Sequence, residues 1–223
     1  MQRYPYALRV LPETLASKWE SPSFAPYRDA FPAEYRASPA ALTAHVHDLV
    51  AGDIKAPYLK SLQGLLWKDG YLSGALKAPL FADVTPRLTD WHKAGIALVI
   101  YSSGSVPAQK LLFQHTGVVG GNNDGNGSGT DVTPLLSGYY DTINAGPKTV
   151  AASYSAILAQ QELPHADISP DSWLFLSDNV LEVEAAHAAG LQSYLVQRPG
   201  NAPLAADIAK KHRVIASFDE IDL

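Results

Sequence analysis

Three short apolar runs after residue 80 each end in small or polar residues, and helical patterns separate them. These runs span residues 96–101, 173–176 and 193–196. Apolar strands that alternate with helices are typical of a parallel sheet covered by helices on both faces. The sequence therefore predicts an α/β fold with a doubly wound parallel sheet. In such sheets a ligand is expected beyond the carboxyl ends of the strands.

Residues 1–75 show helical periodicity and no strand pattern. Ser38 followed by Pro39 is a typical helix start, and apolar residues then recur at helical spacing up to Val50. A second helix is expected from Pro57 to Trp67, with Gly70 at its carboxyl-terminal cap. We therefore expect a helical domain over residues 1–75 and an α/β domain over residues 76–223.

The composition excludes several classes of protein. The 223 residues include no cysteine, which excludes disulfides and thiolate zinc sites and favours a reducing compartment. No apolar run reaches the roughly 18 residues of a membrane span, and the amino terminus does not resemble a signal peptide. The net charge of −5 comes without a basic stripe, which argues against nucleic acid. We expect a cytoplasmic monomer, with the nucleus as a second location.

A segment rich in glycine and asparagine, GGNNDGNGSG at 120–129, separates two ordered stretches. Its composition is typical of a mobile surface loop. It lacks the lysine of a phosphate-binding loop and the closing glutamate of a calcium-binding loop. We assign it no catalytic role.

The first apolar run ends in Ser102, Ser103 and Gly104, directly before a helix. Their backbone N–H groups could hold an anion with help from the helix dipole. A simpler interpretation makes Ser105 an ordinary helix cap. A serine-hydrolase elbow requires glycine two residues before the nucleophile, and neither Ser102 nor Ser103 has one.

Lys148 and Asp178 each allow two interpretations. Lys148 is expected at the start of a helix, where it is either a surface lysine or a cation beside a bound phosphate. Asp178 ends the second apolar run, where it is either a helix cap or an oxygen ligand for magnesium. Considered singly, each structural interpretation is the simpler one.

The order of these residues resembles haloacid-dehalogenase-type phosphatases, in which a strand-end serine, a lysine before a helix and a strand-end aspartate follow one another. The closer resemblance is to the enolase-phosphatases, also called acireductone synthases, of methionine salvage. It covers nearly the whole chain apart from the 120–129 segment. The segments that carry it are YPYALRVLPETL at 4–15, LKSLQGLLWKDGYLSG at 59–74, KAPLFADVTP at 77–86, YSSGSVPAQKLLF at 101–113, SGYYDTINAGPKT at 137–149, FLSDN at 175–179 and QRPGNAPL at 197–204.

The resemblance implies a substrate and a set of roles. The family converts 2,3-diketo-5-methylthiopentyl-1-phosphate to the acireductone 1,2-dihydroxy-3-keto-5-methylthiopentene, with magnesium as cofactor. Ser102, Ser103 and Gly104 would bind the phosphoryl group, Lys148 would neutralise its charge as the catalytic residue, and Asp178 would hold the metal. The helical domain would be a cap over the site.

The resemblance also implies a nucleophilic aspartate in an Asp-x-Glu-Gly-Thr motif after the first strand of the sheet. This motif does not occur in the 223 residues. We therefore expect the chain by itself to hydrolyse phosphate esters poorly. A misassigned start codon and a non-catalytic remnant that binds phosphate or a protein are the two explanations to separate.

In the haloacid-dehalogenase sheet, that first strand lies between the strands that end at Ser102 and at Asp178. Without it, a slot or a foreign strand is expected between residues 96–101 and 173–177. Ser102, Lys148 and Asp178 are expected to converge on one pocket at the carboxyl end of the sheet. Direct pairing of the two segments would contradict this topology.

Overall fold

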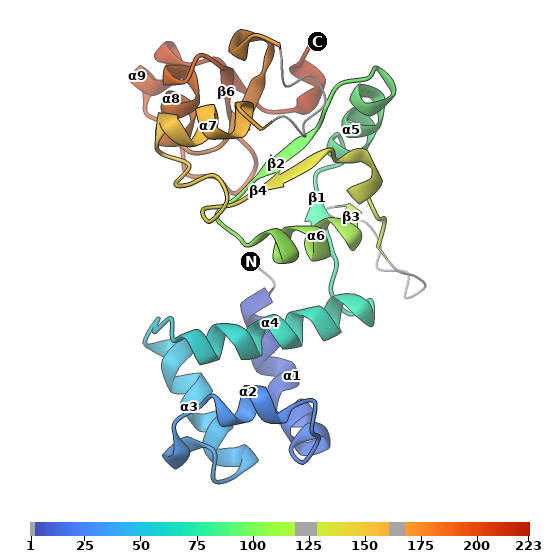
Figure 1. The fold of residues 1–223 in the computed structure, drawn as a ribbon, viewed down its shortest axis with the longest axis vertical. Coiled ribbons are helices and arrows are strands. Elements are labelled where there is room, and N and C mark those ends of the chain that lie inside the picture. Colours follow the sequence, from blue (N-terminus) through green and yellow to red (C-terminus); the bar gives the residue numbers. More distant parts are fainter. Residues whose placement is uncertain (1–2, 119–128, 161–167) are drawn as a thin grey trace. The chain divides into compact units, whose positions relative to one another are not determined.

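The computed structural model describes residues 3–118, 129–160 and 168–223 (Figure 1). These residues form two compact units, one ending at Lys77 and one beginning at Ala78. The sequence analysis placed this division two residues earlier. The function of the helical unit as a cap stays a prediction.

The first unit is helical, and its described residues include no strand. Its elements are α1 (Arg3–Lys18), α2 (Ala25–Asp29), η1 (Ala33–Tyr35), α3 (Pro39–Ala51) and α4 (Pro57–Leu72). The predicted start of α3 is confirmed, because the Ser38 hydroxyl accepts a hydrogen bond from Ala41 N–H at 3.2 Å.

Gly70 does not cap α4, as the sequence analysis expected, but lies buried inside this helix. A Cβ atom at this position would come within 2.6 Å of the Tyr6 ring. Glycine is therefore needed here for the close approach of α1 to α4, and α4 continues to Leu72. Sequence spacing alone does not distinguish this packing role from a cap.

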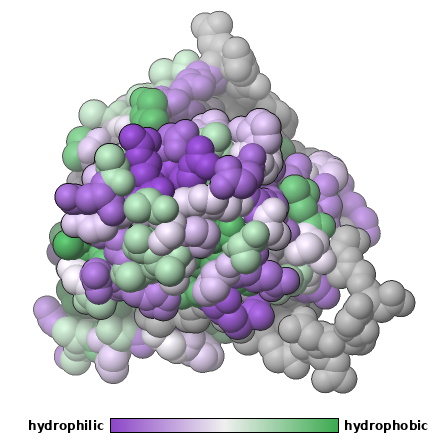
Figure 2. All heavy atoms as spheres, turned by 90° about the horizontal axis from the view of Figure 1, so that it is seen from below, coloured by the Kyte–Doolittle hydropathy of each residue, from purple (hydrophilic) through white to green (hydrophobic). Residues whose placement is uncertain are grey.

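The helical unit has one continuous core of buried side chains from α1, α3, α4 and the segment between α1 and α3. Leu11, Leu15 and Leu42 are fully buried, and Leu62 is 1% exposed. On the face that Figure 2 shows, hydrophilic and hydrophobic residues are mixed. In this unit the large apolar side chains therefore pack mainly in the interior.

The second unit alternates helices with strands, as predicted. Its helices are α5 (Val84–Lys93), α6 (Val106–Gln114), α7 (Ala151–Leu158), α8 (Val180–Ala188) and α9 (Ala206–Lys211), with short 3-10 turns η2 (Thr133–Leu135), η3 (Pro170–Ser172) and η4 (Phe218–Glu220). Its strands are β1 (Ala78–Leu80), β2 (Val99–Tyr101), β3 (Thr116–Val118), β4 (Gly138–Tyr140), β5 (Leu174–Ser177), β6 (Gln192–Val196) and β7 (Val214–Ile215). All pairings between these strands are parallel.

The strands form three separate sheets within the described residues. β1 pairs with β3, β2 with β4, and β5 with β6, which pairs in turn with β7. Figure 1 shows β2 and β4 as neighbouring arrows. No ladder in the described part of the chain joins β2 to β5. The predicted interruption between these two strands is confirmed.

Helices cover both sides of the strands. Leu88 and Trp91 of α5 pack with Leu98, Leu174 and Leu176 on one side. On the other side, Tyr154 of α7 and Ala186 of α8 pack with Tyr101 and Phe175. The second unit is therefore a three-layer α/β arrangement whose middle layer is incomplete.

Two further expectations are settled only in part by the structure. Residues 119–128, which include nearly all of the glycine-asparagine segment, lie outside the described residues. Among the described helices, none is long and apolar enough to cross a membrane.

Candidate active site

The turn after β2 is fixed by hydrogen bonds that involve two of the three N–H groups predicted to hold an anion. Ser102 N–H donates to the Tyr140 carbonyl of β4 at 3.0 Å, and Gly104 N–H donates to the Ser102 hydroxyl at 3.1 Å. An anion at this turn would therefore rely on the N–H group of Ser103 and the hydroxyl groups of Ser102 and Ser103.

Asp141, which the sequence analysis missed, holds the start of α6 against β4. Its carboxylate accepts from Val106 N–H at 3.0 Å and from the N–H groups of Ile143 and Asn144. These backbone donors lower the pKa of Asp141. Ser105 makes no side-chain cap bond, so the expected capping role passes to Asp141, which lies 35 residues after Val106.

Gln109 of α6 stabilises the same turn with its side-chain amide. Its side-chain amide is buried and donates to the Gly104 carbonyl at 2.7 Å and to the Tyr140 carbonyl at 2.8 Å. The turn that carries Ser102 and Ser103 is therefore held in one shape by α6 and β4. A binding site on a fixed turn loses little conformational entropy when its ligand arrives.

Lys148 lies three residues before α7, rather than in its first turn as predicted. Its ammonium lies 2.5 Å from the carboxylate of Glu182 on α8, and only 20% of the Lys148 side chain is exposed. The Ser177 hydroxyl at the end of β5 donates to the same Glu182 oxygen at 2.7 Å. Lys148 is thus a partly buried cation at the carboxyl end of β5.

Glu182 is a second residue that the sequence analysis missed. It is buried, and it joins Lys148 to the residue directly before Asp178. No local signal in the sequence singles it out, because its partner Lys148 lies 34 residues earlier and the two meet only in the folded chain.

Two tyrosines anchor the loop that carries Lys148. Tyr101 of β2 donates to the Gly146 carbonyl at 2.7 Å, and Tyr154 of α7 donates to the Lys148 carbonyl at 2.6 Å. Burial raises the pKa of both phenols, and the Glu182 charge adds to the shift of Tyr154. Both tyrosines therefore remain protonated donors at neutral pH.

Asp178 follows β5 and is exposed. It does not cap α8, because the Asn179 side chain accepts from Leu181 N–H at 3.0 Å and fills that role. The Asp178 carboxylate instead accepts from the Asn201 amide at 2.8 Å, after β6. The alternative capping interpretation of Asp178 is wrong.

The fit of magnesium to these residues can be assessed from their donor atoms. The described residues contain no cluster of three acidic or histidine side chains placed to hold a metal ion. Mg²⁺ commonly binds through one or two carboxylates and completes its shell with water and substrate phosphate. The exposed carboxylate of Asp178 fits that mode as one ligand.

The structure brings some of the predicted site residues together. Lys148 and Ser177, the neighbour of Asp178, both bind the carboxylate of Glu182. Tyr101 connects the loop that carries Lys148 to the strand that ends before Ser102. Within the described residues, Ser102 makes no hydrogen bond to Lys148 or Asp178. The single pocket for all three stays a prediction.

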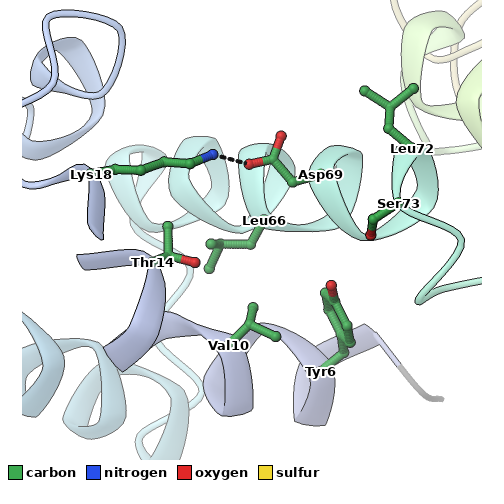
Figure 3. Close-up of a pocket in the computed structure, with 8 residues that line it drawn as sticks. All are labelled: Tyr6, Val10, Thr14, Lys18, Leu66, Asp69, Leu72 and Ser73. Atoms are coloured by element: carbon green, nitrogen blue, oxygen red, sulfur yellow. Dashed lines mark hydrogen bonds and ion pairs between the residues drawn. The ribbon is translucent and has the colours of Figure 1, made fainter. Parts of the chain in front are cut away.

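A separate pocket, lined by none of the predicted site residues, lies inside the helical unit between α1 and α4 (Figure 3). Its volume is about 370 Å³, and its lining is partly apolar, with Val10 and Leu66, and partly polar. Lys18 and Asp69 form an ion pair of 2.7 Å at its edge, with side chains 44% and 39% exposed. Compared with Lys148, Lys18 is well solvated.

The three-layer fold, the turn after β2, and a partly buried lysine and an acidic residue at the end of β5 define a haloacid-dehalogenase-like hydrolase. No protein-family model matches the chain. Curated relatives named enolase-phosphatase E1 do: the one from Pyricularia oryzae is 56% identical over 98% of this chain and 89% of its own length, and the one from Podospora anserina is 58% identical over 98% and 88%. The chain therefore belongs to the enolase-phosphatase E1 family.

Solved structures agree with this assignment. The UTR4 protein of Saccharomyces cerevisiae is 35% identical and has a TM-score of 0.81, over 98% of this chain and 90% of its own. A β-phosphoglucomutase-like protein from Thermotoga maritima has a TM-score of 0.54 at 14% identity, and it supports the fold alone.

Proposed function

We propose that the chain is a magnesium-dependent enolase-phosphatase of methionine salvage. The substrate would be 2,3-diketo-5-methylthiopentyl-1-phosphate, which is enolised and then hydrolysed. In the net reaction the ester P–O bond is hydrolysed with one water, and the products are inorganic phosphate and the acireductone. The support comes from the relatives' names and from the residues at the carboxyl ends of β2 and β5.

The observation that carries this proposal is the Lys148 ammonium, held by Glu182 beside the end of β5. A transferring phosphoryl group carries negative charge on its oxygens, so catalysis of its transfer depends mainly on positioning and charge stabilisation. Lys148 supplies a fixed positive charge with little water around it. The hydroxyl groups of Ser102 and Ser103 would orient the phosphoryl oxygens.

Magnesium, when bound, would polarise the substrate carbonyl and draw charge from the phosphate. Asp178 would hold it, oriented by the amide of Asn201. The protein's own residues bind and orient the phosphate and hold the charges around it. We further propose that it acts as a cytoplasmic monomer, with the nucleus as a second location.

The test measures phosphate release from the diketone phosphate with and without magnesium. Two proteins are compared: the 223-residue chain, and the chain preceded by a strand that ends in the family's Asp-x-Glu-Gly-Thr motif. We expect magnesium-dependent release by the second protein and little by the first. Absence of release from both, with phosphate still bound, would instead support a non-catalytic phosphate-binding protein.

A further inference from the structure

The turn after β6 brings an asparagine amide to Asp178. Asn201 N–H donates to the Arg198 carbonyl at 3.0 Å, which closes a four-residue turn. Pro199 and Gly200 occupy its two central positions, and Gly200 has a φ of +97°. Proline followed by a residue with positive φ is typical of a type II β-turn. The backbone of this turn therefore sets where Asn201 lies relative to the end of β6.

Hydrogen bonds also determine which way the Asn201 amide faces. Arg198 N–H donates to the Asn201 Oδ1 atom at 2.6 Å. A backbone N–H group can only donate, so the amide oxygen lies on this side and the NH2 group on the other. The NH2 group donates to Oδ2 of Asp178 at 2.8 Å. A hydrogen bond to a carboxylate is charge-assisted, and it is stronger than one between neutral groups.

Arg198 attaches this turn to the rest of the α/β unit. Its guanidinium lies over two aromatic rings, 4.8 Å from the centroid of Phe81 and 5.1 Å from that of Phe218. It also donates to both carboxylate oxygens of Asp83, and only 12% of the Arg198 side chain is exposed. A large movement of the turn would disrupt these contacts. They therefore keep Asn201 next to Asp178.

We propose that Asn201 is a positioning residue for the metal ligand Asp178, and that Arg198 is its anchor. The amide holds Oδ2 of the carboxylate, and within the described residues Oδ1 accepts no hydrogen bond. Oδ1 is therefore the oxygen that Asp178 presents to a metal ion. Loss of such a partner of a ligand typically weakens metal binding by about 10- to 100-fold. The inference rests on the proposed function, because it takes magnesium as the ion at Asp178.

A purely structural role of Asn201 is the alternative. In that case the bond from Arg198 N–H to Oδ1 only closes the turn, and the contact with Asp178 has no consequence for metal binding. A positioning role acts through the Asp178 carboxylate, whereas a structural role does not depend on it. Variants with and without this carboxylate therefore separate the two roles.

The contact itself is tested without metal, by NMR of the 223-residue chain. In Asp178→Ala the Asn201 NH2 group loses its acceptor, so its protons should exchange with water at least about threefold faster. The matched control, Asp171→Ala, removes another exposed carboxylate of the same unit, and it should leave these signals unchanged. Unchanged exchange of the Asn201 NH2 group in Asp178→Ala would overturn the proposal.

Metal binding is measured with Mn²⁺ as a paramagnetic probe, through the broadening of the Asn179 N–H signal next to Asp178. Asn201→Ala should weaken Mn²⁺ binding by about tenfold or more. The control Gln192→Ala removes a side-chain amide that donates to the Asp171 carbonyl at 2.8 Å, at the opposite end of β6. It should bind Mn²⁺ as the unchanged chain does. Equal affinities of Asn201→Ala and the unchanged chain would overturn the proposal.

Double variants show whether each residue acts through the next. In the Asp178→Ala chain, the remaining Mn²⁺ affinity should be the same with and without Asn201→Ala, and a further loss would support the structural role instead. Arg198→Lys keeps the charge but lacks the planar group that binds Asp83 through two hydrogen bonds. It should weaken Mn²⁺ binding in the chain with Asn201 and have no effect in Asn201→Ala. A loss in both would overturn the anchoring role of Arg198.

Failure of this inference differs from failure of the proposed function. If Mn²⁺ broadens the Asn179 signal equally in the unchanged chain and in Asn201→Ala, only the positioning role fails. If the unchanged chain shows no broadening there, Asp178 holds no metal, and the magnesium site of the proposed function fails as well. If Asn201→Ala does not fold, the exchange of the Asn201 NH2 group in Asp178→Ala decides.

Discussion

The two units of this chain differ in how their buried side chains are arranged. In the helical unit, each helix satisfies its backbone hydrogen bonds internally, and the buried side chains form one cluster around Leu11, Leu42 and Leu62. In the α/β unit, strands need neighbours, and the buried side chains form separate clusters around a cavity of about 630 Å³. The described helices therefore enclose one core, whereas the described strands leave a cavity between β2 and β5.

The largest expected effect concerns two lysines in different surroundings. In the chain fused to the Asp-x-Glu-Gly-Thr strand, Lys148→Ala should lower kcat for phosphate release by about 100-fold or more, because it removes a fixed charge from the phosphoryl site. Lys18→Ala in the helical unit and Lys110→Ala on α6 remove the same charge from more exposed places. Both should retain most of the activity, and an equal loss in all three variants would show that Lys148 acts only through net charge.

Ion pairs should show the next largest contrast. Asp83 binds Arg198, with side chains 11% and 12% exposed, and it also accepts from Phe218 N–H at 2.7 Å. Asp83→Ala should destabilise the α/β unit by about 3–5 kcal/mol, because the Arg198 charge stays buried without its partner. Asp69→Ala breaks the exposed pair with Lys18 and should cost the helical unit less than about 1 kcal/mol.

Urea unfolding followed by NMR signals from each unit measures both values. A similar loss of stability in Asp69→Ala and Asp83→Ala would mean that the two ion pairs are equally solvated, which would contradict their different exposure in the structure.

Asp83 also makes the two units respond differently to acid. Burial alone would raise its pKa, but hydrogen bonds from Arg198, the Phe218 N–H group and Ser217 lower it from 3.8 to about 2. A lowered pKa in the folded state means that the stabilisation is complete at neutral pH and is lost as the pH falls toward 2. We expect the α/β unit to lose about 2 kcal/mol over this range.

Asp83→Asn is the matched variant for this effect. Its stability should be lower at neutral pH and should change less between pH 5 and pH 2. An unchanged pH profile in this variant would assign the acid sensitivity to another group.

The smallest contrast compares two leucines truncated to alanine. Leu42 is fully buried in the helical core, and its truncation should cost about 3–5 kcal/mol. Leu176 is half-buried and lines the cavity, so fewer neighbours are lost and the cost should be about 1–2 kcal/mol. Thermal unfolding of both variants checks this, and equal costs would argue that the cavity is filled in solution.

Local signals in the sequence predicted local structure well. The Ser38-Pro39 start of α3 follows from capping chemistry, and the alternation of strands and helices after residue 80 follows from periodicity. β2 is shorter than the predicted run over 96–101, because Ile96 N–H still donates to Trp91 at the end of α5. The hydrogen-bonded ladder between β2 and β4 begins at Val99, which pairs with Gly138.

Contacts between distant segments were not predictable from single residues. The sequence predicts Gly70 as a helix cap, because the contact with Tyr6 is formed only in the fold. It likewise predicts Ser105 as a cap, because only the fold brings the acceptor Asp141 to the start of α6. The role of Glu182 depends on its ion pair with Lys148, which lies 34 residues earlier in the sequence. Ser102, Lys148 and Asp178 were singled out by their places at strand ends and before a helix, whereas their roles came from the family resemblance and stay predictions.

The central claim is that the facing edges of β2 and β5 are open. Amide hydrogen exchange of the free 223-residue chain tests it most directly. The N–H groups of Ile100 and Phe175 donate into existing ladders, whereas those of Val99, Tyr101, Leu174 and Leu176 face the cavity. We expect the second group to exchange at least about tenfold faster than the first. Equal protection of both groups would show that β2 and β5 pair with each other or with another strand, and would contradict the account.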